Sequence, residues 1–166
     1  MNLSISRYVD HYKTKWKKKS RIYGESIEDW ISDELTCRKC EGALKKKPVN
    51  CKGIDHECIN CGETYQVKAQ GKKFTFKNDA IKIMGAEYNT TLKTISKDNP
   101  NFFLVNYEEK DNIIKEVLYI PRKHISKDVV IPRKKLSENA RRAGWQGCYL
   151  RFLKDSTFSV NLTQIG

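Results

Sequence analysis

Two pairs of cysteines have the spacing that most directly predicts chemistry in this sequence. Cys37 and Cys40 form one CxxC pair, and Cys58 and Cys61 form a second. Zinc takes four soft ligands in a tetrahedron, and a CxxC turn brings two thiolates to one ion. We therefore expect a zinc ribbon over residues 37–62. All four ligands come from the protein, so the site should be closed and structural.

Other interpretations of the cysteines are less favoured. Four buried free thiols or a redox CxxC would not require two matched pairs. Gly42 and Gly62 follow the two pairs, where the chain has to bend. Cys51 and Cys148 lie outside the pattern, and we interpret both as small apolar residues.

A second set of residues, Asp55 and Gln66-Val67-Lys68, flanks the second cysteine pair. Residues 63–69 have the period of a strand, which places Gln66 and Lys68 on one face, about 7 Å apart. Asp55, the Gln66 amide and the Val67 carbonyl offer oxygen ligands of the kind Mg²⁺ prefers. Lys68 would orient or deprotonate a water and offset charge on a phosphate. This set fits phosphodiester hydrolysis.

The zinc ribbon would position this set. If the second knuckle is a pinned hairpin, Asp55 and the Gln66/Lys68 face meet at one end of it. By itself the pattern is weak, because Gln66 is neutral where an acid is usual and should bind metal less strongly. A solvated polar strand face is the alternative. Strand alternation points His56 to the opposite face, so we expect it to have a structural role.

A basic loop over residues 137–147 predicts contact with DNA. Arginines bind phosphates or guanine edges, glycine permits close approach, and tryptophan can stack or wedge. The alternative is a surface loop anchored by one tryptophan. The main DNA-binding candidates are Arg141, Arg142 and Trp145, flanked by Arg133, Lys134 and Lys135, with Lys72 and Lys73 as weaker ones.

The elements that must position these residues follow from apolar spacing. We expect an amphipathic helix in the first 20 residues with a basic face, a second helix from Ser26 to just before Cys37, and a third from an Asn78 cap through Ile95. Strands are expected at 63–69, 102–107, 113–120 and 129–131, with a closing hairpin of 148–153 and 158–162. This order predicts a mixed α/β sheet with one central helix packed across it.

Composition sets limits on the partner and the compartment. The 166 residues carry a formal net charge of +12, which favours a polyanionic partner. No apolar run is long enough to span a bilayer, and the N-terminal positive charges follow the apolar residues, the reverse of a secretory signal. We expect one cytoplasmic domain over residues 1–166, with reduced cysteines and no membrane contact.

Three segments together resemble a known family. They are Asp55 to Lys68 with the second CxxC, Asp98 to Leu104, and the run Ala-Arg-Arg-Ala-Gly-Trp-Gln-Gly-Cys ending at Cys148. They are similar to the catalytic domain of the DpnI-type restriction endonucleases, grouped with the Dam-replacing proteins, over about residues 7–153. The resemblance implies a PD-(D/E)XK core with an inserted zinc ribbon and Mg²⁺-dependent cleavage of double-stranded DNA. It assigns catalysis to Asp55, Gln66 and Lys68, and zinc to the four paired cysteines.

Two departures from the family matter for function. Gln66 occupies the position of the usual second acid. The family's type member has a C-terminal winged-helix domain that reads adenine-methylated GATC, and we expect none before Gly166. Modification dependence therefore remains open.

Three functions are compatible with these observations. The first is a type II-like restriction endonuclease, acting as a monomer or a transient dimer on DNA. The second is a non-catalytic zinc-ribbon DNA-binding protein with a degenerate nuclease site. The third is a protein that uses the ribbon for protein contacts. Mg²⁺-dependent cleavage separates the first from the second, and salt-dependent DNA binding separates the second from the third.

Overall fold

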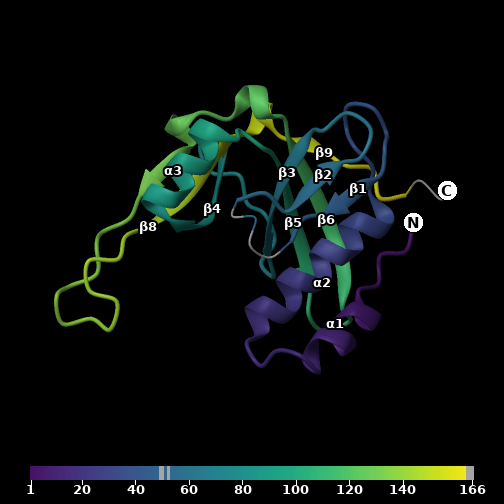
Figure 1. Ribbon diagram of the computed structural model, residues 1–166, viewed down its shortest axis with the longest axis horizontal. Helices are drawn as coiled ribbons and strands as arrows, with labels where there is room; N and C mark the ends of the chain where they lie inside the picture. The colour runs from purple at the N-terminus through teal and green to yellow at the C-terminus, as the bar shows by residue number, and fades with distance from the viewer. Residues whose placement is uncertain (49–50, 52, 164–166) are drawn as a thin grey trace.

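The computed structural model describes residues 1–48, 51 and 53–163. Figure 1 shows the helices and strands in chain order. The helices are α1 (Ser6–Lys13), α2 (Lys19–Glu34) and α3 (Tyr88–Lys97), with short 3-10 turns at Arg122–His124, Lys127–Val129 and Lys154–Ser156. The strands are β1 (Leu44–Lys46), β2 (His56–Cys58), β3 (Thr64–Gln70), β4 (Ala80–Glu87), β5 (Asn101–Glu108), β6 (Ile113–Ile120), β7 (Val130–Pro132), β8 (Gly147–Leu153) and β9 (Phe158–Ser159).

Strand β5 lies at the centre of the larger sheet and is buried on both faces. Phe103 and Val105 belong to one apolar core, whereas Phe102 and Leu104 belong to the other. The larger sheet has the order β1-β2-β3-β5-β6-β9, with β3 parallel to β5 and the other neighbours antiparallel. This arrangement confirms the predicted mixed α/β class and the buried strand.

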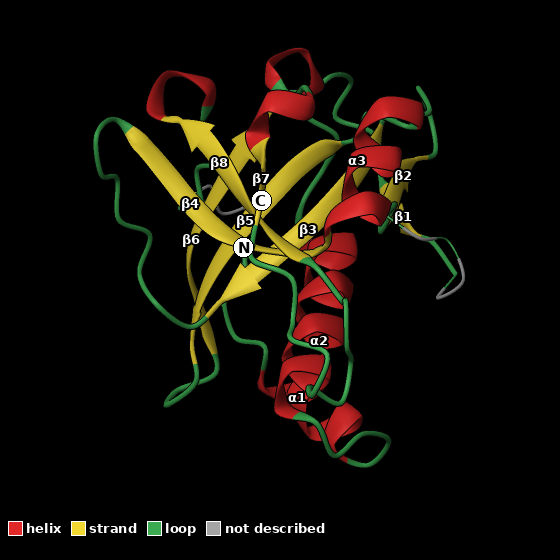
Figure 2. Ribbon diagram, turned by 90° about the vertical axis from the view of Figure 1, so that its left-hand side faces the viewer, coloured by secondary structure: helices red, strands yellow, loops and turns green. Residues whose placement is uncertain are grey.

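Helices α1 and α2 supply one of the two cores (Figures 1 and 2). Trp30 is fully buried there, and its Nε1 donates to the Asn2 carbonyl at 2.7 Å. The predicted start of the second helix was wrong, because α2 begins at Lys19. Ser26 lies inside α2, where its hydroxyl donates to the Ile22 carbonyl at 2.6 Å. A serine can either cap a helix or donate to the carbonyl four residues earlier inside a helix, and the local sequence does not distinguish the two.

The other core lies between the large sheet and a small sheet of order β4-β8-β7. The predicted helix from Asn78 was therefore wrong in its first half. Ile81 and Ile83 are buried and pair with Phe152 and Leu150 of β8. Met84, within the span of the predicted helix, is 59% exposed. The helix is limited to α3.

The predicted closing hairpin was also wrong. Strand β8 pairs with β4 and β7, while β9 pairs with β6 in the large sheet, and a 3-10 turn at Lys154–Ser156 separates them. Both segments are strands, as predicted, but the strands they pair with are distant in sequence. In the part of the chain that the structure describes, no helix has the length and apolar character needed to cross a membrane.

Candidate functional site

Asp55 occupies the edge of strand β3. Strand β2 pairs with β3 only at Thr64 and Tyr65. Beyond Tyr65, Asp55 makes the hydrogen bonds to the edge of β3 that a neighbouring strand would otherwise make. Its backbone N–H donates to the Tyr65 carbonyl at 2.9 Å, and its carboxylate Oδ2 accepts the Val67 N–H at 2.7 Å. The carboxylate therefore lies beside the backbone between Gln66 and Lys68.

Lys68 is a half-buried amine with no hydrogen bond or ion pair to any described residue. It lines a small pocket between β3 and β4 together with Phe74 and Ile83. Burial lowers the pKa of the Lys68 amine, and the Asp55 carboxylate opposes that shift. Partial burial of an ammonium without a hydrogen bond or ion pair has a desolvation cost, which a bound anionic ligand would offset.

Gln66 precedes this lysine by two residues on the same strand, so both side chains share one face. It is half-buried, and its amide makes no hydrogen bond within the described residues. The pKa of the Asp55 carboxyl is raised by burial, against the lowering effects of the Val67 N–H and the Lys68 charge. The three side chains thus share one partly desolvated environment.

Glu28, in the middle of α2, lies near this environment and was not predicted from the sequence. Burial raises the pKa of its carboxyl to about 7, and the Asp55 charge adds to the shift. The charge of Glu28 in turn affects Lys68. The sequence around Glu28 contains only a group of acids on one helix, which by itself indicates a solvated face. The proximity to Asp55 is a tertiary effect.

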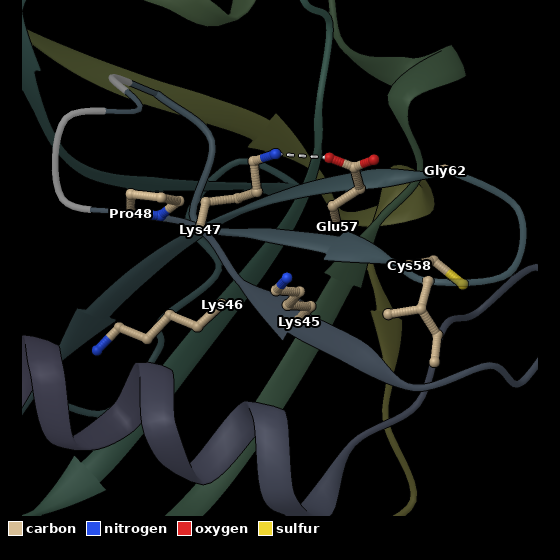
Figure 3. Close-up of a pocket in the computed structure, with 8 residues that line it drawn as sticks. Lys45, Lys46, Lys47, Pro48, Glu57, Cys58 and Gly62 are labelled. Atoms are coloured by element: carbon tan, nitrogen blue, oxygen red, sulfur yellow. Dashed lines mark hydrogen bonds and ion pairs between the residues drawn. The ribbon is translucent and has the colours of Figure 1, made fainter.

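Lys46, the last residue of β1, bridges this helix to the sheet. Its amine lies 2.7 Å from Glu25, 2.9 Å from Asp29 and 3.5 Å from Glu28. Figure 3 shows Lys46 extending toward the helix, whereas Lys47 reaches Glu57 on the other side of the strand at 2.8 Å. Alternation along β1 therefore directs one lysine into the acidic face of α2.

The four paired cysteines come together in a cluster. Their Sγ atoms lie within 4.8 Å of one another, with Cys37 and Cys61 at 3.6 Å and Cys40 and Cys58 at 3.4 Å. Zinc with metal–sulfur distances of about 2.3 Å has sulfur–sulfur edges of roughly 3.8 Å. The donor set and its spread therefore fit one tetrahedral zinc, as the spacing predicted.

Tyr65 connects the cysteine cluster to strand β3. Its hydroxyl lies 3.2 Å from the Cys37 Sγ and accepts the Arg38 N–H at 3.0 Å. Its ring stacks on Phe103 of the central strand at 4.8 Å between centroids. Because Gln66 is the next residue, the position of the cluster and that of the candidate site depend on the same strand.

Tyr65→Phe should test this connection. We expect an intact fold that loses about 1 kcal/mol of unfolding free energy, since the Arg38 N–H loses its acceptor. Zinc should also pass more readily to a chromogenic chelator. Tyr119→Phe removes a hydroxyl that contacts Asn101 at 3.3 Å and serves as the control. Equal chelator competition in the two variants would contradict the connection.

His56 and the two remaining cysteines belong neither to the candidate site nor to the cysteine cluster. His56 is fully buried, and its Nε2 bonds the Glu28 carbonyl at 2.8 Å. Burial lowers the pKa of His56 to about 4, so the ring is neutral near pH 7 and donates this bond. Cys148 is buried in the second core and Cys51 is half-buried, both as free thiols. These positions agree with a structural His56 and an apolar Cys148.

The basic loop extends β7 and β8 into an arm, residues 133–146, that projects away from the body of the molecule (Figure 1). Arg141 and Arg142 are exposed, and the Arg142 guanidinium lies 4.5 Å from the centroid of the Trp145 ring. Trp145 is half-buried against the stem, where a Cβ on Gly147 would approach the ring to 2.9 Å.

The two weaker DNA-binding candidates, Lys72 and Lys73, are exposed in the loop that follows β3. The Lys72 carbonyl accepts from Gln70 and from Asn106, which fixes this loop to the end of β3. These lysines therefore follow the strand that carries Lys68, whereas the arm belongs to the small sheet.

A comparison with known protein families provides independent evidence on identity. The family model described as "DpnI: Dam-replacing family" matches residues 1–158. The chain belongs to the Dam-replacing family. The match is wider than the segment 7–153 inferred from motifs, and it includes both α1 and β9. Membership in the Dam-replacing family indicates a DNA endonuclease of the restriction type, with DNA as its partner.

Proposed function

We propose that this member of the Dam-replacing family is a cytoplasmic, Mg²⁺-dependent endonuclease that cleaves both strands of DNA in a restriction system. One observation carries the proposal: the Asp55 carboxylate accepts the Val67 N–H beside the half-buried Lys68, whose amine has no hydrogen bond or ion pair to another described residue. Family membership indicates which reaction such a set performs.

The donor atoms at the β3 edge fit Mg²⁺. In a strand, the N–H and the C=O of one residue point to the same edge. The Val67 N–H reaches Asp55, so the Val67 carbonyl faces the same edge. With the Asp55 carboxylate and the Gln66 amide, these are the hard oxygen ligands Mg²⁺ takes. Bound there, Mg²⁺ would polarise the scissile phosphate and acidify a water.

Lys68 would accept the proton of the attacking water. Its Nζ orients the attacking water and, in its neutral form, takes a proton from it. Burial makes that neutral form more accessible by lowering the pKa. In its charged form the amine offsets the charge that builds on the phosphorane. Asp55 keeps the amine close to the edge of β3 by charge attraction.

DNA binding would rest on the basic surface. The net charge of +12 provides a general attraction to phosphates. Arg141, Arg142 and Trp145 would contact the duplex from the arm, and Lys72 and Lys73 from beside the catalytic strand. Zinc would hold the cysteine cluster as a structural element. One catalytic set per chain requires a transient dimer on DNA or two successive nicks.

The proposed function is tested by incubating the zinc-loaded chain with plasmid grown with or without adenine methylation, in Mg²⁺ or in EDTA. We expect discrete bands in Mg²⁺ and none in EDTA. A preference between the two plasmids would establish modification dependence. Intact plasmid of both kinds in Mg²⁺ would overturn the nuclease assignment.

The second candidate function is a DNA-binding protein without catalysis. The neutral Gln66 favours it, because one negative charge is missing where an acid is usual. Salt-dependent binding to both plasmids with no cutting in Mg²⁺ or Mn²⁺ is the result expected from that function.

Replacing Arg141 and Arg142 together with alanine should reduce the salt dependence of DNA binding. Loss of two phosphate contacts reduces the steepness of the negative slope of log Kobs against log salt by about 1.8. Fluorescence anisotropy in EDTA at several salt concentrations measures it. Lys110→Ala with Lys115→Ala removes the same charge from two exposed sites, one in the β5–β6 turn and one in β6. An equal change of slope in the two double variants would contradict a specific role of the arm in DNA binding.

A further inference from the structure

Glu28 has a carboxylate that the nuclease mechanism does not yet use. We propose that Glu28 supplies the second carboxylate of the metal site, in place of the acid that strand position 66 lacks. The inference rests on the proposed nuclease function and adds a ligand from α2 to a set otherwise drawn from the sheet edge.

One hydrogen bond joins the backbone of Glu28 to the residue that follows Asp55. The Glu28 carbonyl accepts a hydrogen bond from the Nε2 of His56 at 2.8 Å, and His56 directly follows Asp55. His56 is fully buried, so this bond is shielded from water. The middle of α2 is therefore attached to the residue next to the proposed metal ligand.

Lys46 contacts the Glu28 carboxylate less closely than it contacts the other two acids of α2. Lys46 is held closely by Glu25 and Asp29, whereas its contact with Glu28 is 3.5 Å. The Glu28 side chain is only 24% exposed, and it shares the Lys46 ammonium with two other carboxylates. A largely buried carboxylate that shares one ammonium with two other acids is only partly compensated, and such groups are often found where they bind a ligand.

The charges around Glu28 also favour a divalent cation. Four carboxylates on α2 and at the sheet edge face two ammonium groups, those of Lys46 and Lys68. With all groups ionised, two negative charges are uncompensated, which one Mg²⁺ would neutralise. The carboxylates are Glu25, Glu28, Asp29 and Asp55.

A relocated acid also explains how Gln66 can be tolerated. Two carboxylates and a carbonyl are a common set for a catalytic divalent ion. With Gln66 neutral, Asp55 alone would be a poor ligand set. A carboxylate from α2 restores the charge without changing the strand, and the Gln66 amide then completes the ligands as a neutral donor.

The test measures Mn²⁺ binding to the zinc-loaded full chain without DNA, by electron paramagnetic resonance. We expect Glu28→Gln to weaken Mn²⁺ binding at least about tenfold. Glu25→Gln and Asp29→Asn are matched controls, because each removes one charge from the same helix and touches the same lysine. Both should change Mn²⁺ binding less than about threefold.

A rescue separates ligation from general charge. Adding Gln66→Glu to Glu28→Gln should restore Mn²⁺ binding, because the acid then returns to the strand. Thermal unfolding of each variant is followed by circular dichroism, and Glu28→Asp, expected to bind with intermediate affinity, serves if Glu28→Gln is unfolded. Equal effects of Glu28→Gln and the controls, or no rescue, would overturn the inference.

Plasmid cleavage by the same variants distinguishes this inference from the proposed function. In one outcome the wild-type chain cuts DNA, and Glu28→Gln matches the controls in both cleavage and Mn²⁺ binding. That outcome supports the nuclease and overturns the role of Glu28. A wild-type chain that binds Mn²⁺ through Glu28 but never cuts supports the inference and overturns the nuclease. A wild-type chain that binds no Mn²⁺ would overturn the metal site.

Discussion

Lys68→Ala is expected to reduce plasmid cleavage by about a thousandfold while DNA affinity stays within a few-fold of wild type. No hydrogen bond or ion pair joins the amine to another described residue, so we expect the fold to tolerate its removal. Its proposed contributions, proton transfer and charge offset, together account for losses of this size, equivalent to roughly 4 kcal/mol of activation free energy. Single-turnover cleavage with excess enzyme measures the rate directly.

The matching change at the metal site should be Asp55→Asn rather than Asp55→Ala. Asparagine keeps an oxygen for the Val67 N–H, which alanine would leave without its acceptor at the edge of β3. We expect a similar loss of cleavage and a loss of Mn²⁺ binding. Lys110→Ala is the control, since this exposed lysine lies outside the proposed metal and DNA sites. Cleavage within tenfold of wild type in Lys68→Ala would exclude the mechanism.

Removal of the zinc is expected to have the largest effect on stability. Structural zinc sites contribute about 10–16 kcal/mol of apparent binding free energy in small folds, so chelation should unfold the ribbon and abolish cleavage. Because Tyr65 joins the cluster to β3, the loss should extend to the candidate site. Cys40→Ser should have the same effect as the chelator.

Metal content, circular dichroism and cleavage are to be followed together during zinc removal. Cys51→Ser is the matched control, since Cys51 is a free cysteine outside the cluster. A chain that keeps its spectrum and activity after complete metal removal would show that the cysteines play no structural role through zinc.

Features with local causes could be predicted from the sequence. The cysteine cluster follows from two turns that each depend on four residues, and the buried strand β5 follows from its apolar run. The proximity of Asp55 to strand β3 follows from one hairpin. In each case the residues that matter are close together in the chain, or are constrained by one metal.

Features that depend on distant partners could not be predicted. Ile81 and Ile83 fit either a helix or a strand, and only pairing with β8 decides between them. The partner of β9 is set by β6, not by its neighbour in sequence. Glu28 lies near Asp55 only because α2 packs on the sheet, a contact that no short pattern describes.

The way Asp55 covers the edge of β3 has a consequence for solution behaviour. An uncovered strand edge in a large sheet can add a strand from another molecule, and inward-facing charges are one way that proteins prevent this. Here a single carboxylate occupies the hydrogen-bonding position where an intruding strand would begin to pair. Variants that shorten Asp55 should therefore lose solubility as well as activity, and concentrated samples should form aggregates.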